Sequence, residues 1–419
     1  MRKISVLDSM QVLRIVGLCL SINPVLNSSF ALAETASSGA QTVAAPAAQA
    51  GDAALASATS SATPAVATPS VAADPKMLQW AGNLRHRFET VRNESPAAGK
   101  NETYDHMRLR LRLGAVAKPV ESLKIEFRLA TGAGGTSTNQ SYGDSVKGFR
   151  NYDFKLDRAA FDYEIAESLH AVGGRIASPW VLVGENDMLF DADLNFDGTG
   201  LMVKHVFDGF ELGAAGGLFI LEESKDTSVA SSSDVRLNAI QFNAKVKTDV
   251  LDVVATAAEY SYIGVPQHAA ILTGDFGGNS NSGGFYTYGY RVTAFGLELQ
   301  SKVMNLPLLA FYEMAQNAES VDRTASIVGV KVGQLKGAGD FMVSWDYRDI
   351  QKDATLGILT DGDSFGGGTD GRSHRLTAGY GVNKSFSAWL AVISGEKGIS
   401  AGATPAGRQR ITVDALFKF

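Results

Sequence analysis

The sequence predicts an all-β fold: a transmembrane, antiparallel, up-and-down β-barrel of about sixteen strands. Three observations predict it. Apolar and polar side chains alternate with a period of two, short and long connections alternate along the chain, and the chain ends in an amphipathic strand whose last residue is aromatic. No stretch after the N-terminal leader has the long uncharged apolar run of a membrane helix. A closed barrel is then the remaining way to satisfy backbone groups in lipid.

The alternation is clearest in residues 108–113, where arginine and leucine alternate strictly. Only a strand places two such sets on opposite faces, because a helix would spread the arginines around its circumference. Residues 123–129 show the same pattern, and residues 84–89 show it more loosely. A soluble sandwich would give this pattern as well, so other features must decide between sandwich and barrel.

The connections make that decision. We expect short connections at 118–120, 167–168 and 208–209, and long ones at 131–154 and 178–197. The same strict alternation of short and long connections continues to the C-terminus. Outer-membrane barrels have tight turns at one end and longer external loops at the other, with an even number of strands.

The N-terminal region predicts export. Arg2 and Lys3, an apolar stretch and the run Ala31-Leu32-Ala33 indicate a secretory signal peptide at 1–33. Residues 34–75 contain no aromatic and no basic residue, so we expect a disordered low-complexity spacer there. Whether the spacer only links or also docks to the cell wall or a partner is open. The barrel then occupies 76–419.

Several function classes are disfavoured. The one cysteine, Cys19, lies in the leader, so the mature chain has no disulfide, zinc-thiolate site or thiol nucleophile. The net charge of −6 gives no reason to expect nucleic-acid binding. A run of acidic residues from Asp191 resembles a calcium loop, but Phe196 stands where an EF-hand needs glycine. With no catalytic motif in the sequence, we expect no enzyme activity, cofactor or metal.

If the alternating leucines face lipid, their basic neighbours face the lumen. That places nine residues inside: Arg85, Arg87, Arg108, Arg110, Arg112, Lys124, Arg128, Arg158 and Arg175. A basic wall favours anions, and arginine binds phosphate or carboxylate through two parallel hydrogen bonds. Acidic residues such as Glu89 and Asp157 lie on the same strands, so an ionic network that merely stiffens the wall is the alternative. The two interpretations are compatible.

Short pieces of the first half, taken in order, resemble the Putative porin family of bacterial outer-membrane barrels. The pieces are 80–85, 108–114, 130–132, 156–159, 173–179 and 191–194. The resemblance implies a passive pore in outer-membrane lipid that passes small solutes or ions. General porins are often trimers, so a homotrimer is a candidate assembly.

In general porins the third loop often folds into the lumen and narrows it. By that analogy the third long connection is a candidate constriction loop, with Glu185, Asp187, Asp191, Asp193 and Asp197. Its carboxylates would face the basic wall and create a transverse field. The alternative is an external loop whose charges are solvated.

The C-terminal strand ends with Phe417 and Phe419 on its apolar face. This ending resembles the signal that the barrel-assembly machinery recognises in outer-membrane proteins. We therefore expect an outer-membrane, porin-like channel for small hydrophilic solutes, with a preference for anions. The alternative is a barrel without an open pore that acts as an anchor, adhesin or receptor.

Overall fold

The structure is a computed structural model. It describes residues 78–95, 99–132, 136–143, 151–224, 233–272, 274–400, 402 and 404–419. The predicted signal peptide (1–33) and spacer (34–75) lie outside the described residues.

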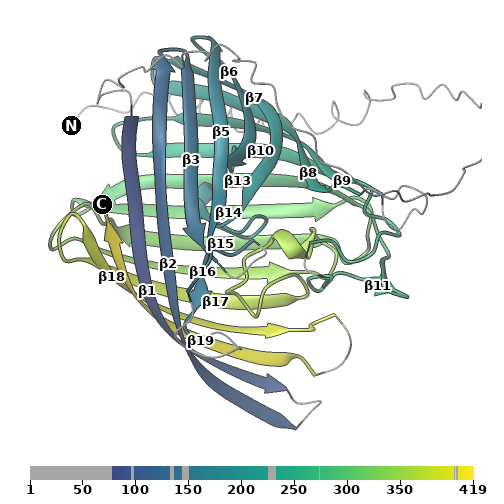
Figure 1. The fold of residues 1–419 in the computed structure, drawn as a ribbon. Coiled ribbons are helices and arrows are strands. Elements are labelled where there is room, and N and C mark those ends of the chain that lie inside the picture. The colour runs from purple at the N-terminus through teal and green to yellow at the C-terminus, as the bar shows by residue number, and fades with distance from the viewer. Residues whose placement is uncertain are drawn as a thin grey trace, which may run out of the picture.

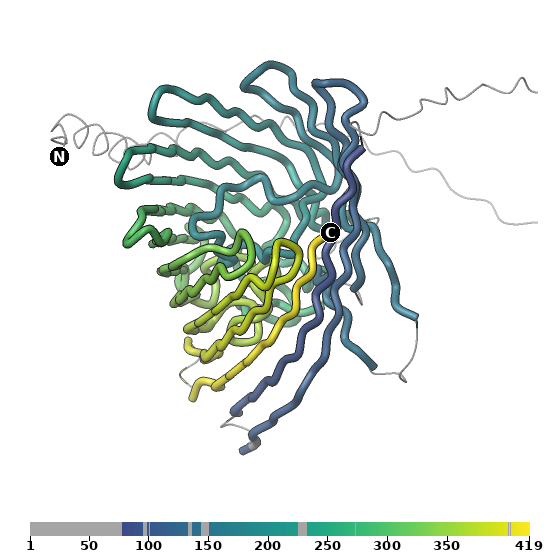
Figure 2. The backbone as a smooth tube through the Cα atoms, turned by 90° about the vertical axis from the view of Figure 1, so that its left-hand side faces the viewer, coloured from purple at the N-terminus to yellow at the C-terminus, as the bar shows by residue number. Residues whose placement is uncertain are grey.

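Sixteen strands form one closed antiparallel barrel (Figure 1), as the sequence predicts. Consecutive strands pair with each other, and β1 pairs with β19 to close the wall, from Asn83 opposite Lys418 to Glu94 opposite Gly407. Figure 2 shows the purple β1 running beside the yellow C-terminal strand. The strands are β1 (Leu78–Ser95), β2 (Lys100–Val120), β3 (Leu123–Thr131), β5 (Phe154–Ala166), β6 (Leu169–Ala177), β7 (Asn195–Phe207), β8 (Phe210–Glu222), β9 (Val235–Val246), β10 (Asp252–Ile263), β13 (Tyr290–Val303), β14 (Leu306–Asn317), β15 (Thr324–Gly333), β16 (Phe341–Ile350), β17 (Gly371–Gly381), β18 (Phe386–Lys397) and β19 (Ala406–Lys418).

The remaining elements are short and lie in the long connections. They are β4 (Gln140–Ser141), β11 (Asn281–Ser282), β12 (Phe285–Tyr286) and the 3₁₀ turns η2 (Val183–Glu185) and η4 (Gly357–Leu359). In the part of the chain that the structure describes, no helix has the length and apolar character needed to cross a membrane.

The period-two pattern places apolar side chains on the outer face. Trp80, Met107, Leu156 and Leu218 all have more than half of their surface exposed there. On β2 the arginines between the leucines point the other way, and Arg112 reaches Asp193 inside the barrel at 2.7 Å. The outer face is therefore the apolar band that contacts lipid.

The connections follow the predicted alternation with an exception. The connection 334–340 belongs to the short set, yet it is longer than 318–323 at the opposite end. The Asp340 carboxylate accepts hydrogen bonds from the N–H groups of Lys336 and Gly337, each at 2.8 Å, and so closes this longer turn. The prediction that short and long connections alternate strictly was thus wrong at this pair of connections. Elsewhere among the described strands, the short connections lie at one end of the barrel and the long ones at the other.

The barrel interior has two unlike halves. Along β6 to β15 the inward side chains form a buried apolar cluster that includes Phe196, Phe219 and Tyr260. The indole of Trp180, from the connection after β6, packs edge-on against all three rings, with centroids 5.4–6.1 Å apart. This cluster fills its side of the lumen, so the polar passage must run beside β1, β2 and β16 to β19.

Candidate functional site

Loop 178–194, between β6 and β7, folds into the lumen. Val183, Met188 and Phe190 are fully buried in the apolar cluster. The N–H of Val181 donates to Gln241 Oε1 on β9 at 2.7 Å. These contacts on the inner faces of distant strands place the loop inside the barrel.

The loop carries its carboxylates from one wall to the other. Asp187 accepts from Arg348 on β16 at 2.7 Å and from Arg375 on β17 at 2.9 Å. Asp193 accepts from Arg112 on β2 at 2.7 Å. Arginines of two separate walls therefore hold the two ends of the acidic segment.

A second connection, loop 351–370 between β16 and β17, also turns inward. Asp363 lies 2.8 Å from Arg410 on β19 and 3.1 Å from Arg87 on β1. The two loops touch, because the N–H of Asp191 donates to the carbonyl of Leu359 at 2.8 Å. The polar passage is thus bounded by two loops rather than one.

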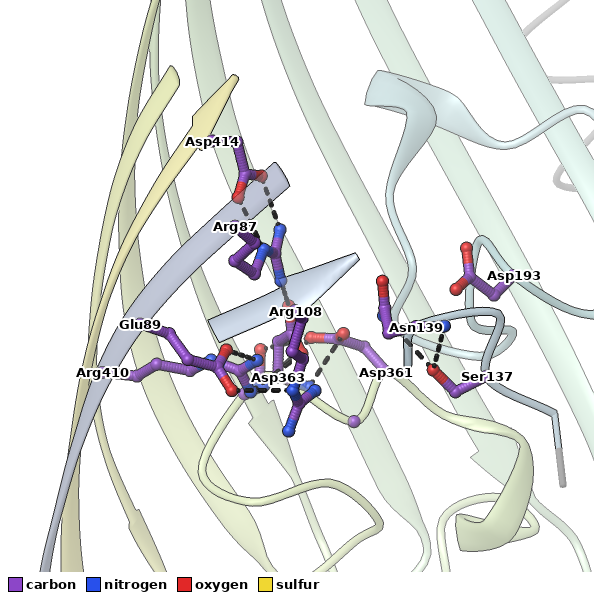
Figure 3. A network of polar contacts seen from close by, with 12 residues as sticks. Arg87, Glu89, Arg108, Ser137, Asn139, Asp193, Asp361, Asp363, Arg410 and Asp414 are labelled. Atoms are coloured by element: carbon purple, nitrogen blue, oxygen red, sulfur yellow. Dashed lines mark hydrogen bonds and ion pairs between the residues drawn. The ribbon is translucent and has the colours of Figure 1, made fainter. Parts of the chain in front are cut away.

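The wall formed by β19, β1 and β2 is a ladder of ion pairs (Figure 3). The Arg87 guanidinium donates two hydrogen bonds to Asp414, both at 2.7 Å. Glu89 lies between Arg108 at 3.0 Å and Arg410 at 2.5 Å. Most of the basic charge on this wall is neutralised at close range.

Three arginines of this wall have no close carboxylate among the described residues: Arg85, Arg110 and Arg408, the last of which donates to Asn93 Oδ1 at 2.9 Å. The nearest carboxylate oxygen to Arg85 belongs to Asp414, at 4.0 Å, and the nearest to Arg110 belongs to Asp193, at 3.6 Å. Arg85 instead donates to the side-chain oxygen of Asn139.

Two cavities follow the passage. The larger, about 500 Å³, lies between the ladder and the two loops, and the smaller, about 260 Å³, is lined by β1, β2 and β17 to β19. Five residues line both cavities: Arg85, Arg87, Arg110, Asp363 and Arg375.

The loop carboxylates respond differently to this environment. Burial raises the pKa of Asp191 to about 7, and the nearby charges of Asp361 and Asp193 add to the effect. Burial also opposes ionisation of Asp193 and Asp187, but arginines outweigh it and hold the pKa of both carboxyls below the usual range. Asp191 is therefore a loop carboxyl that titrates near neutral pH, while Asp187 and Asp193 stay charged.

Eight of the nine predicted basic residues lie on the inner face. Of these, the residues that line a cavity are Arg85, Arg87, Arg108 and Arg110. Arg112 lines neither cavity but pairs with Asp193, which lines the larger one. Arg128 pairs with Asp157 at 2.5 Å and Arg158 with Glu126 at 3.0 Å, away from both cavities. Lys124 lies 3.9 Å from Glu126 on the same face of β3.

Arg175 requires a correction. Its neighbour Ile176 packs in the apolar cluster inside the barrel, so Arg175 lies on the outer face of β6. It pairs there with Asp197, at 2.5 Å. Asp197 was predicted on the constriction loop, but it belongs to β7 and also faces outward.

Of the other predicted loop residues, Asp187, Asp191 and Asp193 line the larger cavity. Glu185 lies apart from that cavity and pairs with Lys331 on β15 at 3.0 Å. At the C-terminus, Phe417 stacks on Phe386 with ring centroids 4.6 Å apart, and Phe419 exchanges two backbone hydrogen bonds with Gly82. Whether these two phenylalanines act as an assembly signal remains a prediction.

The sequence interpretation missed the basic residues of the last strands and the second acidic loop. Arg348, Arg375, Arg410, Asp361 and Asp363 all take part in the network around the passage. The sequence could have predicted the inward position of Arg408 and Arg410. Even spacing puts them on the same face of β19 as Asp414, and the apolar Ile411 lies on the other face. Among the described residues, no group of three or more His, Cys, Asp or Glu side chains is placed to hold a metal ion.

A closed antiparallel barrel with an apolar outer band and a charged, loop-bounded interior defines a channel protein of the outer membrane. The sequence profile described as Putative porin matches residues 44–272, more than half of the chain, so this chain belongs to the Putative porin family. The outer membrane is accordingly where the protein resides.

Several solved outer-membrane proteins are similar in structure, and the similarity to one of them, OprB, extends to the fold. OprB of Pseudomonas putida is 10% identical with a TM-score of 0.52, over 82% of this chain and 94% of that chain. OmpF of Salmonella typhi is 12% identical with a TM-score of 0.47, over 82% and 97%. A loop-deletion mutant of OmpT from Vibrio cholerae is 11% identical with a TM-score of 0.47, over 82% and 99%. Curated protein sequences give no match.

Proposed function

We propose that this barrel is an open, water-filled channel through which small hydrophilic solutes diffuse, and that it prefers anions. The excess of basic side chains along the passage carries the proposal. The larger cavity is lined by eight basic and six acidic side chains, and the smaller by four basic and two acidic ones. Fixed charge in a pore sets the local ion concentration, so this excess favours anions.

Planar-bilayer recording of the refolded full-length barrel under a KCl gradient tests the proposal. K⁺ and Cl⁻ have similar mobility in water, so the reversal potential reports the charge bias of the protein. We expect discrete current steps and a reversal potential shifted toward that of chloride. Steps with a potential shifted toward potassium would keep the channel and overturn the anion preference.

A third connection, 264–289 between β10 and β13, also reaches the larger cavity with Asp275 and Gly277. Its contacts with loop 351–370 favour a second candidate, a closed barrel that acts as an anchor, adhesin or receptor. In addition to the contact between loops 178–194 and 351–370, Thr369 donates its N–H to the carbonyl of Gly277 at 2.7 Å. The N–H of Gly357 donates to Asn279 Oδ1 at 2.8 Å. Absence of current steps from a correctly folded barrel would favour this candidate over the channel.

We further propose that a signal peptide at 1–33 directs export, and that the barrel-assembly machinery recognises the C-terminal strand through Phe417 and Phe419. A homotrimer is the proposed assembly. Mass measurement of the protein extracted in mild detergent, before and after heating, distinguishes a trimer from a monomer. Non-enzymatic diffusion requires no cofactor.

A further inference from the structure

Arg85 and Arg110 form an unusual pair among the five residues that line both cavities. They are directly opposed on β1 and β2, and both point into the lumen. Like charges at opposed positions of neighbouring strands destabilise a sheet unless other groups neutralise them.

The adjacent pair shows how the protein neutralises such charges elsewhere. Arg87 and Arg108 are also directly opposed, but Asp414 lies 2.7 Å from Arg87 and Glu89 lies 3.0 Å from Arg108. No carboxylate approaches Arg85 closer than 4.0 Å or Arg110 closer than 3.6 Å in the described residues.

The two carboxylates nearest to the pair are already engaged. Asp414 accepts two hydrogen bonds from Arg87, and Asp193 pairs with Arg112 at 2.7 Å. Two positive charges of the Arg85–Arg110 pair therefore remain without a dedicated partner.

The surroundings of the pair suit a bound anion. Each side chain is 13% exposed, so water screens the charge only partly. Both residues line both cavities, so an anion can reach them from either side. Ser137 and Asn139 line the larger cavity beside them and offer neutral hydrogen-bonding groups.

We infer that Arg85 and Arg110 form a binding site for a small oxyanion that carries two negative charges, such as sulfate or hydrogen phosphate. Each guanidinium is planar and binds two oxygens of one oxyanion in parallel, and two guanidiniums match a charge of −2. The inference rests on the proposed channel, because it makes this site a step along the anion pathway.

The test uses wild-type and variant full-length barrels in planar bilayers with KCl on both sides. Potassium sulfate is added at constant ionic strength, and the fall in chloride current gives a half-blocking concentration. A second arm uses potassium hydrogen phosphate at pH 8. We expect saturable block by both anions in the wild type. The half-blocking concentration should rise at least about tenfold in each single variant, Arg85→Gln and Arg110→Gln, and further in the double glutamine variant that combines them.

Two further variants separate a site from general electrostatics. Lys124→Gln removes a positive charge from the inner face of β3, away from both cavities, so block should be unchanged. The double variant Arg85→Lys with Arg110→Lys keeps the charge but loses two-point binding, so block should weaken while the chloride preference persists.

The outcomes are decisive for the inference and separable from the proposed function. Chloride steps that sulfate and phosphate reduce equally in wild type and in the double glutamine variant would overturn the site but leave the channel intact. If the folded barrel conducts nothing, the channel proposal fails, and calorimetric titration of sulfate onto the barrel in detergent then decides the site. Saturable heat of binding in the wild type that is absent from the double glutamine variant would support the oxyanion site. Absence of binding heat in the wild type would overturn the site.

Discussion

Asp414 is a residue on which the charged wall depends. Its carboxylate accepts both hydrogen bonds of the Arg87 guanidinium, and the two side chains keep only 11% and 9% of their surface exposed. Arg87 in turn faces Arg108 on the next strand, so the carboxylate offsets a repulsion as well as a desolvation cost. The pair therefore stabilises the junction between β19 and β1, where the barrel closes.

We predict that Asp414→Asn lowers the free energy of unfolding by about 3 kcal/mol, the low end for breaking a buried ion pair, because Arg87 keeps Asp363 as a second partner. Urea unfolding of the barrel in lipid vesicles measures the change. Asp105→Asn is the matched control, since Asp105 accepts a hydrogen bond from Thr90 on the exposed outer face. Equal stability of the two variants would contradict the role given to Asp414.

Residue placement could be predicted best where apolar and basic residues alternate strictly. Arg108, Arg110 and Arg112 alternate with leucines, and the structure places them on the inner face. Arg175 was assigned by residue type, and that prediction was wrong because Ile176 is an apolar residue that faces inward. The rule that apolar side chains face lipid fails wherever a loop supplies an apolar partner inside the barrel.

Loop 178–194 shows how a connection becomes part of the channel wall. The buried Trp180 anchors its start, and edge-to-face contacts with Phe196, Phe219 and Tyr260 add to the area that the indole buries. Past this anchor, Asp187 and Asp193 attach the loop to arginines on two walls.

We predict that Trp180→Ala frees the start of this loop while the barrel still folds. The loss of a buried tryptophan costs about 3–5 kcal/mol of local packing, whereas the backbone ladder of the wall is untouched. Single-channel conductance and open-channel noise should both rise.

Trp80→Ala provides the control for size and residue type. Trp80 lies on the outer face with 60% of its surface exposed, so its removal should leave the current unchanged. If the two variants conducted alike, Trp180 would not be the anchor of the loop.

The number and order of the wall strands could be predicted, because each amphipathic strand shows alternating apolar and polar residues in the sequence. The inward course of loop 178–194 was proposed only by analogy, and its fully buried Val183, Met188 and Phe190 were the missed physical signal. Loop 351–370 carried the same kind of signal, because its Leu356, Leu359 and Phe365 are buried in the apolar cluster. Its Asp361 and Asp363 add ion pairs to arginines of other strands. Such long-range ion pairs have no local pattern in a sequence.

At the scale of the whole molecule, the division of the lumen decides the character of the channel. The apolar cluster along β6 to β15 confines water and ions to the side where β16 to β19 meet β1 and β2. Every charge change there acts on the same narrow passage, so a titrating group within it should change the selectivity of the entire barrel.

Asp191 is that group. Its N–H and carboxylate connect the two inward loops, through Leu359 at 2.8 Å and the N–H of Gly362 at 3.3 Å. Burial raises the pKa of the carboxyl to about 7, from an unfolded value of about 4. Between these two values the folded protein holds a proton that the unfolded chain has lost, so the contribution of Asp191 to stability falls as the pH rises toward 7.

We therefore predict that anion preference weakens as the pH rises through about 7, because ionised Asp191 adds a negative charge to the larger cavity. Reversal potentials under a fixed KCl gradient at pH 5.5 and pH 8.5 measure the change. Asp191→Asn should hold the anion preference at its acidic value across this range, while Asp197→Asn, on the outer face, should follow the wild type. A pH dependence that persists in Asp191→Asn would assign the titration to another group and would leave the contact between the two loops without a role in selectivity.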